Sequence, residues 1–116
     1  MPNWIPLTKP EEIEDLSLRS HQKPCLIYKH SSRCNISTIA QYRLEAEWSL
    51  LEQAAVLYWV DVISNRQVSN AVASNFEVYH ESPQVLLIHE GACIFDVSHL
   101  DISVATLKES LAVLRF

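Results

Sequence analysis

The sequence predicts a single α/β domain in which a four-stranded mixed sheet is flanked by helices. Short apolar runs alternate with segments whose apolar residues recur at spacings of three and four, as expected for buried strands and half-buried helices. The last two apolar runs are separated by two residues, which predicts an antiparallel hairpin. A chain of 116 residues supports one hydrophobic core and is too short for two, so residues 1–116 are expected to form one domain.

Each element follows from a local pattern. The first helix is expected to begin near Pro10, because proline suits a first helical turn, Thr8 or Lys9 can cap it, and acidic residues follow. Later helices are expected where apolar residues keep the helical spacing: from Asn35 to Leu51, from Ser64 to Phe76, and from Ser103 to Leu114. Strands are expected at the four short apolar runs, which are 24–29, 55–60, 84–89 and 92–97.

The order of these elements, an N-terminal helix followed by β-α-β-α-β-β-α, has a topological consequence. Two strands joined through a helix become parallel neighbours by a right-handed crossover. The final hairpin, which turns at Glu90-Gly91, adds antiparallel strands. This is the layout of the thioredoxin-like fold.

Composition excludes several classes of function. A net charge of −5 opposes nucleic acid as the main partner, because neutralising phosphates needs a basic surface. The one glycine, Gly91, cannot supply the glycine-rich loop of a nucleotide-binding protein. The N-terminal segment lacks the pattern of a signal peptide, no apolar stretch is long enough to span a membrane, and three widely spaced cysteines form no disulfide framework. We therefore expect a cytoplasmic protein with neither a membrane nor a nucleic acid as partner.

Cys34 is the candidate nucleophile. It lies in the segment Lys-His-Ser-Ser-Arg-Cys-Asn-Ile-Ser (29–37), after the first predicted strand and at the start of the next helix. Unpaired N–H groups and the helix dipole stabilise a thiolate there, and Lys29, Arg33 and protonated His30 would act in the same direction. A lowered pKa of the thiol is therefore expected, and only the thiolate attacks a disulfide. The alternative, a small buried core residue, is opposed by these polar neighbours.

Ser37 completes a Cys-x-x-Ser motif. Because serine cannot close an internal disulfide with Cys34, a redox site here would act through a mixed disulfide. The Ser37 hydroxyl would either donate a hydrogen bond to the thiolate or satisfy backbone groups of the helix, and the pattern leaves both open. Cys25 and Cys93 lie within apolar runs and are expected to pack in the core.

Pro83, which follows Ser82, immediately precedes the third predicted strand. In thioredoxin-like proteins a cis-proline at this position faces the active cysteine, and the backbone of the residue before it pairs with bound substrate like an added strand. The five histidines show no compact zinc-site spacing, so no metal is expected. A Cys-His hydrolase, with His30 or His80 as base, is opposed by the low glycine content and the lack of an oxyanion-hole segment.

Several segments together resemble the monothiol bacilliredoxins, thioredoxin-like proteins associated with the low-molecular-weight thiol bacillithiol. The matching segments span most of the chain in the expected order: 29–37, Arg66 with Ser69-Asn70, His-Glu-Ser-Pro-Gln at 80–84, and Ser98-His99. The resemblance implies that Cys34 is the attacking cysteine, that Ser37 replaces a resolving cysteine, and that Pro83 is the cis-proline.

The resemblance also implies a pocket and a set of partners. The pocket would be framed by residues of two segments: Lys29, His30, Arg33, Asn35, His80, Glu81 and Ser82. The implied activity removes bacillithiol, a co-substrate rather than a tightly bound cofactor, from protein mixed disulfides. The implied partners are bacillithiolated client proteins, a low-molecular-weight thiol and a partner reductase. Asn35 departs from the family pattern Cys-Pro-Ile-Ser, in which proline fixes the first turn of the helix.

Two other functions stay open at this stage. A non-catalytic thioredoxin-like module would dock peptides or clients at the Pro83 edge without turnover, and a Cys34 pKa near an unperturbed value of about 8.5 would favour it. A glutaredoxin-like iron–sulfur carrier has glycine and phenylalanine between its cysteine and serine, and Asn35 and Ile36 oppose that function.

Overall fold

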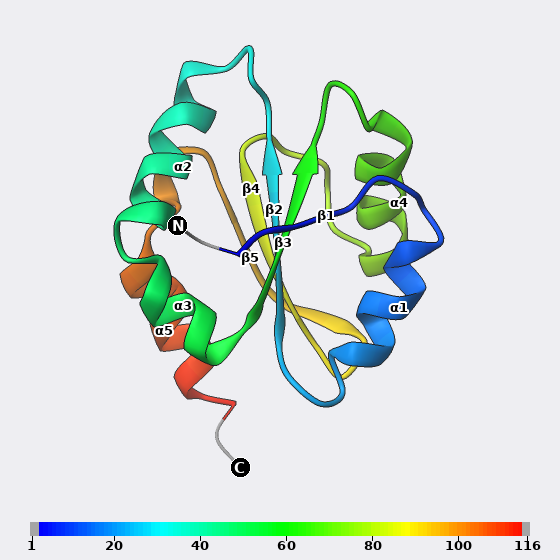
Figure 1. The fold of residues 1–116 in the computed structure, drawn as a ribbon, viewed down its shortest axis with the longest axis vertical. Helices are drawn as coiled ribbons and strands as arrows, with labels where there is room; N and C mark the ends of the chain where they lie inside the picture. Colours follow the sequence, from blue (N-terminus) through cyan, green and yellow to red (C-terminus); the bar gives the residue numbers. More distant parts are fainter. Residues whose placement is uncertain (1–2, 115–116) are drawn as a thin grey trace.

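The computed structural model describes residues 3–114, which form a five-stranded mixed sheet covered by helices on both faces (Figure 1). The strands, in chain order, are β1 (Ile5–Pro6), β2 (Cys25–His30), β3 (Val56–Asp61), β4 (Gln84–His89) and β5 (Ala92–Ser98). The helices are α1 (Glu12–Arg19), α2 (Asn35–Ala46), α3 (Trp48–Ala54), α4 (Arg66–Phe76), the 3₁₀ turn η1 (His99–Asp101) and α5 (Val104–Ala112). Across the sheet the strand order is β1-β3-β2-β4-β5. No helix within residues 3–114 is long and apolar enough to cross a membrane.

Two apolar layers fix the helices to the sheet. Alternate residues of the central strands face opposite sides, so each side carries its own core. Helices α2, α3 and α5 cover one face through residues such as Leu44, Leu51 and Leu107. Helices α1 and α4 cover the other face through residues such as Leu16 and Val72 (Figure 1). The α/β sandwich predicted from the alternation of patterns is therefore present.

The expected sheet of four strands is wrong by one strand. Ile5 and Pro6 form β1, which pairs in parallel with Tyr58 and Trp59 of β3 at the edge of the sheet. Two residues are too few to show a strand period, and a proline is tolerated only at such an edge, so the sequence carries no signal for this strand.

Three helix boundaries also differ from expectation. Helix α1 begins at Glu12 with Glu11 at its N-cap, rather than Thr8 or Lys9, whose N–H groups instead donate to the Glu12 carboxylate. The helix predicted from Asn35 to Leu51 is interrupted at Glu47, whose φ of −130° and ψ of 34° leave the helical region and separate α2 from α3. The apolar spacing continues through the break, which is why periodicity does not reveal it. The helix predicted from Ser64 begins instead at Arg66, because the Asp61 carboxylate accepts hydrogen bonds from the N–H groups of Ile63 and Ser64 and holds a turn there.

Strand register determines which loops meet. Strand β2 runs parallel to β3 and antiparallel to β4, and Lys29 lies opposite Gln84. The end of β2 is therefore beside the start of β4. As a consequence, the loop 31–34 that follows β2 and the segment 80–83 that precedes β4 lie at the same end of the sheet.

Candidate functional site

Cys34 lies at the N-cap of α2, at the end of the loop that follows β2. Its backbone is extended, with φ −115° and ψ 119°, and the side chain is half-buried. The Ser37 N–H, the Ile36 N–H and the Ser37 hydroxyl hold the pKa of the Cys34 thiol below its ordinary value, while partial burial opposes them. The predicted direction of the shift is therefore confirmed. The arrangement favours a thiolate at the exposed start of a helix, which is the form that attacks a disulfide.

The cause of this shift differs from the one expected, because none of the three predicted cations contributes to it. Lys29 is 0% exposed and its side chain points away to Ser69 and His80. Burial lowers the pKa of His30, which keeps the ring neutral near pH 7. Arg33 is exposed in the loop, where water screens its charge. The thiolate is therefore stabilised by hydrogen-bond donors rather than by positive charge.

Ser37 is fully buried, and its hydroxyl contacts both the thiol and a backbone group, which belongs to the preceding loop rather than to the helix. Its Oγ accepts a hydrogen bond from the Ser31 N–H at 3.2 Å, which fixes the loop before Cys34. Its hydroxyl proton then remains for the sulfur, and this hydrogen bond contributes to lowering the pKa of Cys34. One side chain thus joins the loop, the helix and the thiol.

Tyr28 and His30 form a second buried layer beneath α2, and sequence reasoning missed the tyrosine. The Tyr28 hydroxyl donates to the Ser37 carbonyl at 2.8 Å and lies 2.9 Å from His30 Nδ1. Because the carbonyl can only accept and the hydroxyl has one proton, Nδ1 of His30 must carry the proton that it donates to Tyr28. Trp59 packs against both rings, with centroids 4.7 Å from His30 and 5.1 Å from Tyr28. The available signal was the two-residue spacing of Tyr28 and His30 on one strand, which places them on one face.

The segment before β4 is held in place by hydrogen bonds on several sides. The Ser82–Pro83 peptide bond is cis, as predicted. The His99 N–H donates to the Pro83 carbonyl at 3.0 Å, and His99 Nε2 lies 2.6 Å from Glu81 Oε2. Gln84 Nε2 donates to the Tyr79 carbonyl at 2.9 Å. These contacts order the backbone of residues 79–84 at this end of the sheet.

Ser82 and Asn35 make no comparable side-chain contacts. Ser82 Oγ is buried and has no hydrogen-bond partner within residues 3–114. Asn35 is exposed as the first residue of α2. The structure thus brings the predicted residues to one end of the sheet, with Lys29 turned inward and Arg33 and Asn35 turned to solvent.

His80 is exposed, but its Nδ1 faces the protein interior. Lys29 Nζ lies 3.1 Å from this nitrogen and also donates to the Ser69 carbonyl at 3.0 Å, while Ser69 Oγ lies 3.2 Å from the same nitrogen. Burial lowers the pKa of His80, and the charges of Lys29 and Arg66 lower it further, against the opposing effect of Glu81. Ser69 was recognised only as part of a matching segment, and its contact with Lys29 joins α4 to this end of the sheet.

Cys25 is a core residue, as predicted, whereas Cys93 is only half-buried and packs against the edge of the core. Burial raises the pKa of each thiol to about 11. Cys25 of β2 and Cys93 of β5 both lie opposite Ile88 of β4, which runs between these two strands. Their backbones are therefore two strand spacings apart, about 10 Å, which is too far for a disulfide. Cys25 begins β2 and Cys34 follows its end, which separates their backbones by more than about 16 Å. Neither cysteine is placed to resolve a disulfide on Cys34.

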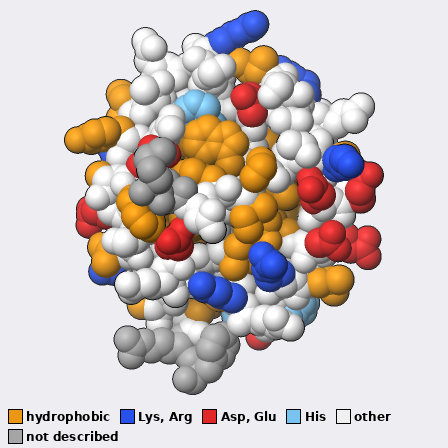
Figure 2. Space-filling model, viewed as in Figure 1, with side chains coloured by type: hydrophobic (Ala, Val, Ile, Leu, Met, Phe, Trp, Pro, Cys, Tyr) orange, Lys and Arg blue, Asp and Glu red, His pale blue; other side chains and the backbone are white. Residues whose placement is uncertain are grey.

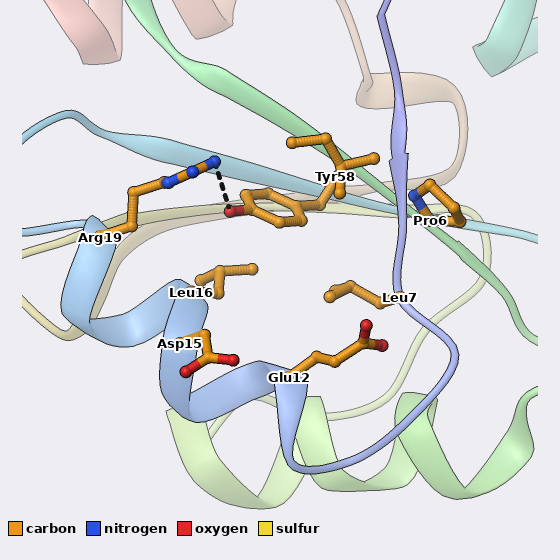
Figure 3. A pocket seen from close by; sticks show the side chains of 8 residues that line it. Pro6, Leu7, Glu12, Asp15, Leu16, Arg19 and Tyr58 are labelled. Carbon is orange, nitrogen blue, oxygen red and sulfur yellow. Dashed lines mark hydrogen bonds between the residues drawn. The ribbon is translucent and has the colours of Figure 1, made fainter.

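Other surface features lie away from this site. A hollow of about 310 Å³ between β1 and α1 is lined by residues such as Leu7, Glu12 and Arg19, none of them a predicted site residue (Figure 3). Arg19 donates to the Tyr58 hydroxyl at 3.4 Å across this hollow. Figure 2 shows hydrophobic side chains gathered in front of the β1–β3 edge and acidic side chains gathered on the side of α1. Within residues 3–114 no three His, Cys, Asp or Glu side chains are grouped closely enough to hold a metal ion.

Comparison with known proteins connects this site to a family. A family model described as monothiol bacilliredoxin BrxC matches residues 5–107. A solved candidate oxidoreductase with a thioredoxin fold is 28% identical, with a TM-score of 0.77 over 91% of each chain. Thioredoxin from Fasciola hepatica is 16% identical, with a TM-score of 0.72 over 99% of this chain and 100% of that one. Thioredoxin from Trypanosoma brucei brucei is 13% identical, with a TM-score of 0.74 over 97% and 91%. These similarities confirm the thioredoxin-like fold.

Proposed function

The chain belongs to the monothiol bacilliredoxin family, and we propose that it removes bacillithiol, or a similar low-molecular-weight thiol, from protein mixed disulfides. Membership of the family supports thiol redox chemistry in general terms, and bacillithiol as the substrate is our proposal. The observation that carries the proposal is Cys34 itself. Its thiol has a lowered pKa at the start of α2, and no second sulfur is placed to resolve a disulfide formed there.

The proposed reaction has two exchanges. The Cys34 thiolate attacks the bacillithiol sulfur of a client mixed disulfide, the client sulfur leaves with the bonding electron pair, and the client thiol is completed by a proton. Cys34 is then joined to bacillithiol by a disulfide. A second low-molecular-weight thiol, or a partner reductase, attacks this disulfide and restores the Cys34 thiolate.

Client recognition would use the other half of the site. The segment 80–83 is ordered by the contacts of His99 and Gln84, and its backbone lies at the same end of the sheet as Cys34. An extended client segment pairing with this backbone would bring its mixed disulfide to the sulfur. The structural partners of the reaction are therefore a client protein and a small thiol, without a tightly bound cofactor.

The decisive experiment traps the intermediate. Wild-type protein, mixed with a bacillithiolated model protein, is expected to gain the mass of one bacillithiol on Cys34 while the model protein loses it. The double variant Cys25→Ser/Cys93→Ser should behave as wild type, and Cys34→Ser should leave the substrate intact. Removal of bacillithiol by Cys34→Ser at the wild-type rate would overturn the proposal. A folded wild type that binds clients without exchange, and whose Cys34 pKa is ordinary, would instead indicate a non-catalytic docking module.

A gain-of-function variant tests why an outside thiol is needed. Ser37 contacts Cys34 directly, so Ser37→Cys places a second sulfur within reach of the first. We expect this variant to release bacillithiol from Cys34 by forming an internal disulfide. An adduct on Ser37→Cys that persists as long as the wild-type adduct would show that the serine position does not determine the monothiol behaviour.

A further inference from the structure

Lys29 is a buried cation that contacts no carboxylate within the described residues 3–114. Its side chain is 0% exposed, and its Nζ contacts the Ser69 carbonyl and His80 Nδ1, both of them neutral acceptors. Lysine is almost never fully buried unless it is paired. Burial lowers the pKa of Lys29 to about 8, so the ammonium form still predominates at neutral pH. A residue kept in this costly position is a candidate for a role in the chemistry of the site.

The contact with Lys29 determines where His80 carries its proton. An ammonium group has only donors, so His80 Nδ1 must accept through its lone pair. A neutral His80 ring therefore carries its hydrogen on Nε2. Among the charged groups facing the ring, Lys29 from β2 and Arg66 from α4 oppose a second proton, and neighbouring Glu81 favours one. The result is a neutral ring whose inner nitrogen accepts and whose outer nitrogen donates.

The position of this ring relates it to the exchange reaction. His80 is exposed and begins the segment 80–83 that leads to the cis-proline Pro83. Lys29 lies opposite Gln84 in the strand register, which sets both groups at the end of the sheet where Cys34 lies. An exchange at this end releases a client sulfur as a thiolate, and that sulfur needs a proton at neutral pH.

We propose that His80 donates this proton from Nε2 and that Lys29 is the positioning residue behind it. The inference rests on the proposed exchange function. As the S–S bond breaks, the client sulfur takes the bonding electron pair and the Nε2 proton of His80, while Nδ1 of His80 takes a proton from the Lys29 ammonium. The ring then returns the Nδ1 proton to Lys29 and takes a new proton from solvent at Nε2, which restores the starting state. The exchange of one disulfide for another is complete, and no further reductant is needed.

The first test is spectroscopic and needs no substrate. Imidazole nitrogen shifts of labelled protein should show His80 with a bare Nδ1 and a protonated Nε2 at neutral pH. Lys29→Met should mix the two tautomers and raise the pKa of His80, because a neighbouring cation is lost. The exposed Lys108→Met is the matched control and should leave His80 unchanged. An unchanged His80 tautomer and pKa in a folded Lys29→Met would overturn the positioning role.

The second test separates proton donation from thiolate reactivity. Release of an alkyl protein thiol from a mixed disulfide should slow roughly tenfold in His80→Asn and Lys29→Met, below the usual contribution of a buried general acid because this ring is exposed. An aryl disulfide releases nitrothiobenzoate, a thiolate that is stable at neutral pH and therefore needs no proton as it leaves. Both variants should react with this disulfide at rates within about twofold of wild type. In the alkyl reaction, the ratio of the wild-type rate to the Lys29→Met rate should fall as pH rises through the pKa of Lys29. The reason is that deprotonated Lys29 no longer supplies a proton to His80.

The outcomes separate this inference from the proposed function. A wild type that reacts with the aryl disulfide but not with a bacillithiolated protein would overturn the substrate proposal. Proton donation by His80 would then be tested with a protein mixed disulfide of glutathione or cysteine as the alkyl substrate. Variants that slow both reactions equally, or neither, overturn proton donation by His80. If Lys29→Met does not fold, His80→Asn decides the matter alone, because His80 is exposed and its replacement leaves the core intact. His21→Gln, an exposed histidine at the other end of the sheet, is its control.

Discussion

The two ends of strand β2 carry the same chemical group in opposite environments. Cys25 opens the strand in the apolar core, and burial raises the pKa of its thiol to about 11. Cys34 follows the end of the strand, and N–H and O–H donors of α2 hold the pKa of its thiol below the ordinary value. The difference arises from position, because the first turn of α2 directs N–H and O–H donors at the Cys34 sulfur, whereas burial in the core dominates at Cys25. Thiol reactivity in this protein is therefore a property of position along the chain.

The same comparison applies to the charged groups at the polar end. Lys29 and His30 are neighbours on β2 and point to opposite faces of the sheet, Lys29 toward α4 and His30 toward Tyr28. Neither one adds positive charge beside the sulfur. The polar end thus combines a thiolate held by neutral donors with a cation placed behind His80, and each arrangement can be tested separately.

The largest expected difference is between the reactivities of the three thiols. The rise from 9.0 to about 11 reduces the thiolate fractions of Cys25 and Cys93 about 100-fold relative to an ordinary thiol, and the pKa of Cys34 is shifted in the opposite direction. A short treatment of native protein with iodoacetamide should therefore label Cys34 almost alone. Peptide mass spectrometry with time measures the three rates. After unfolding in denaturant all three should react similarly, and comparable labelling of Cys25 in folded protein would refute the contrast between the two ends.

Buried Lys29 should make the stability of the fold depend on pH. Its ordinary pKa of 10.5 in the unfolded chain falls to about 8 in the folded one, so the unfolded chain binds more protons between these values. The free energy of unfolding should therefore rise with pH across this window, and below about pH 8 the buried charge costs about 3 kcal/mol. Relative to Lys29→Met, wild-type protein should gain most of this amount as pH increases from 8 to 10.5.

Denaturant unfolding at several pH values measures the effect. The difference between wild type and Lys29→Met isolates this lysine from the cysteines and tyrosines that titrate in the same window. Lys108→Met is the control. Because Lys108 is exposed, the free energy of unfolding of this variant should change with pH as it does in wild type. Parallel curves for wild type and Lys29→Met would mean that the folded protein does not perturb the lysine.

Most of the fold could be predicted because its elements are long enough to show a period. The hairpin, the cap of α5 at Ser103 and the strand at β2 all follow from local patterns. Strand β1 could not be predicted, since two residues have no period, and its pairing with β3 is a tertiary contact. The break at Glu47 is hidden for the opposite reason, because the apolar spacing runs through it.

The site likewise has features that the sequence could predict and features that it could not. The place of Cys34 at a helix start and the cis bond before Pro83 follow from element order and from known behaviour of the fold. The fate of Lys29 does not, because strand alternation shows only that it and His30 face opposite sides. Which side holds Ser69 and His80 depends on the crossover of α4, which is set by the whole sheet. Because Lys29 and His30 are close to Cys34 in the sequence, they were expected to lower its pKa, but neither contributes to the shift.

A medium effect is expected from the hydroxyl that joins the loop to the thiol. Ser37→Ala removes a donor to Cys34 and an acceptor for the Ser31 N–H, so the pKa of Cys34 should rise. The smaller thiolate fraction should slow exchange at neutral pH by a few-fold, because the greater nucleophilicity of a more basic thiolate offsets part of the loss. Titration of the thiolate by its ultraviolet absorbance gives the shift directly. Ser32→Ala, in the exposed part of the loop, should leave the titration unchanged, and an equal shift there would indicate general loosening of the loop.

The smallest effect is expected where this chain leaves its family pattern. Asn35→Pro should keep the pKa of Cys34 nearly unchanged, because the groups that lower it are the Ile36 N–H, the Ser37 N–H and the Ser37 hydroxyl. A proline at the first position of a helix loses no intrahelical hydrogen bond. It also requires extended backbone at the residue before it, and Cys34 already has φ −115° and ψ 119°. The native chain therefore accepts the ring without strain at Cys34.

The gain from Asn35→Pro should appear in stability instead. Restricting the unfolded chain at a compatible position raises the free energy of unfolding by roughly 0.5–1 kcal/mol. Denaturant unfolding measures this gain. Asn35→Ala removes the asparagine side chain without restricting the backbone, so it separates the effect of losing the side chain from the effect of the proline ring. A thiol pKa that moves by a full unit in Asn35→Pro but not in Asn35→Ala would show that the Asn35 N–H supports the sulfur, and the set of donors at the start of α2 would then have to include it.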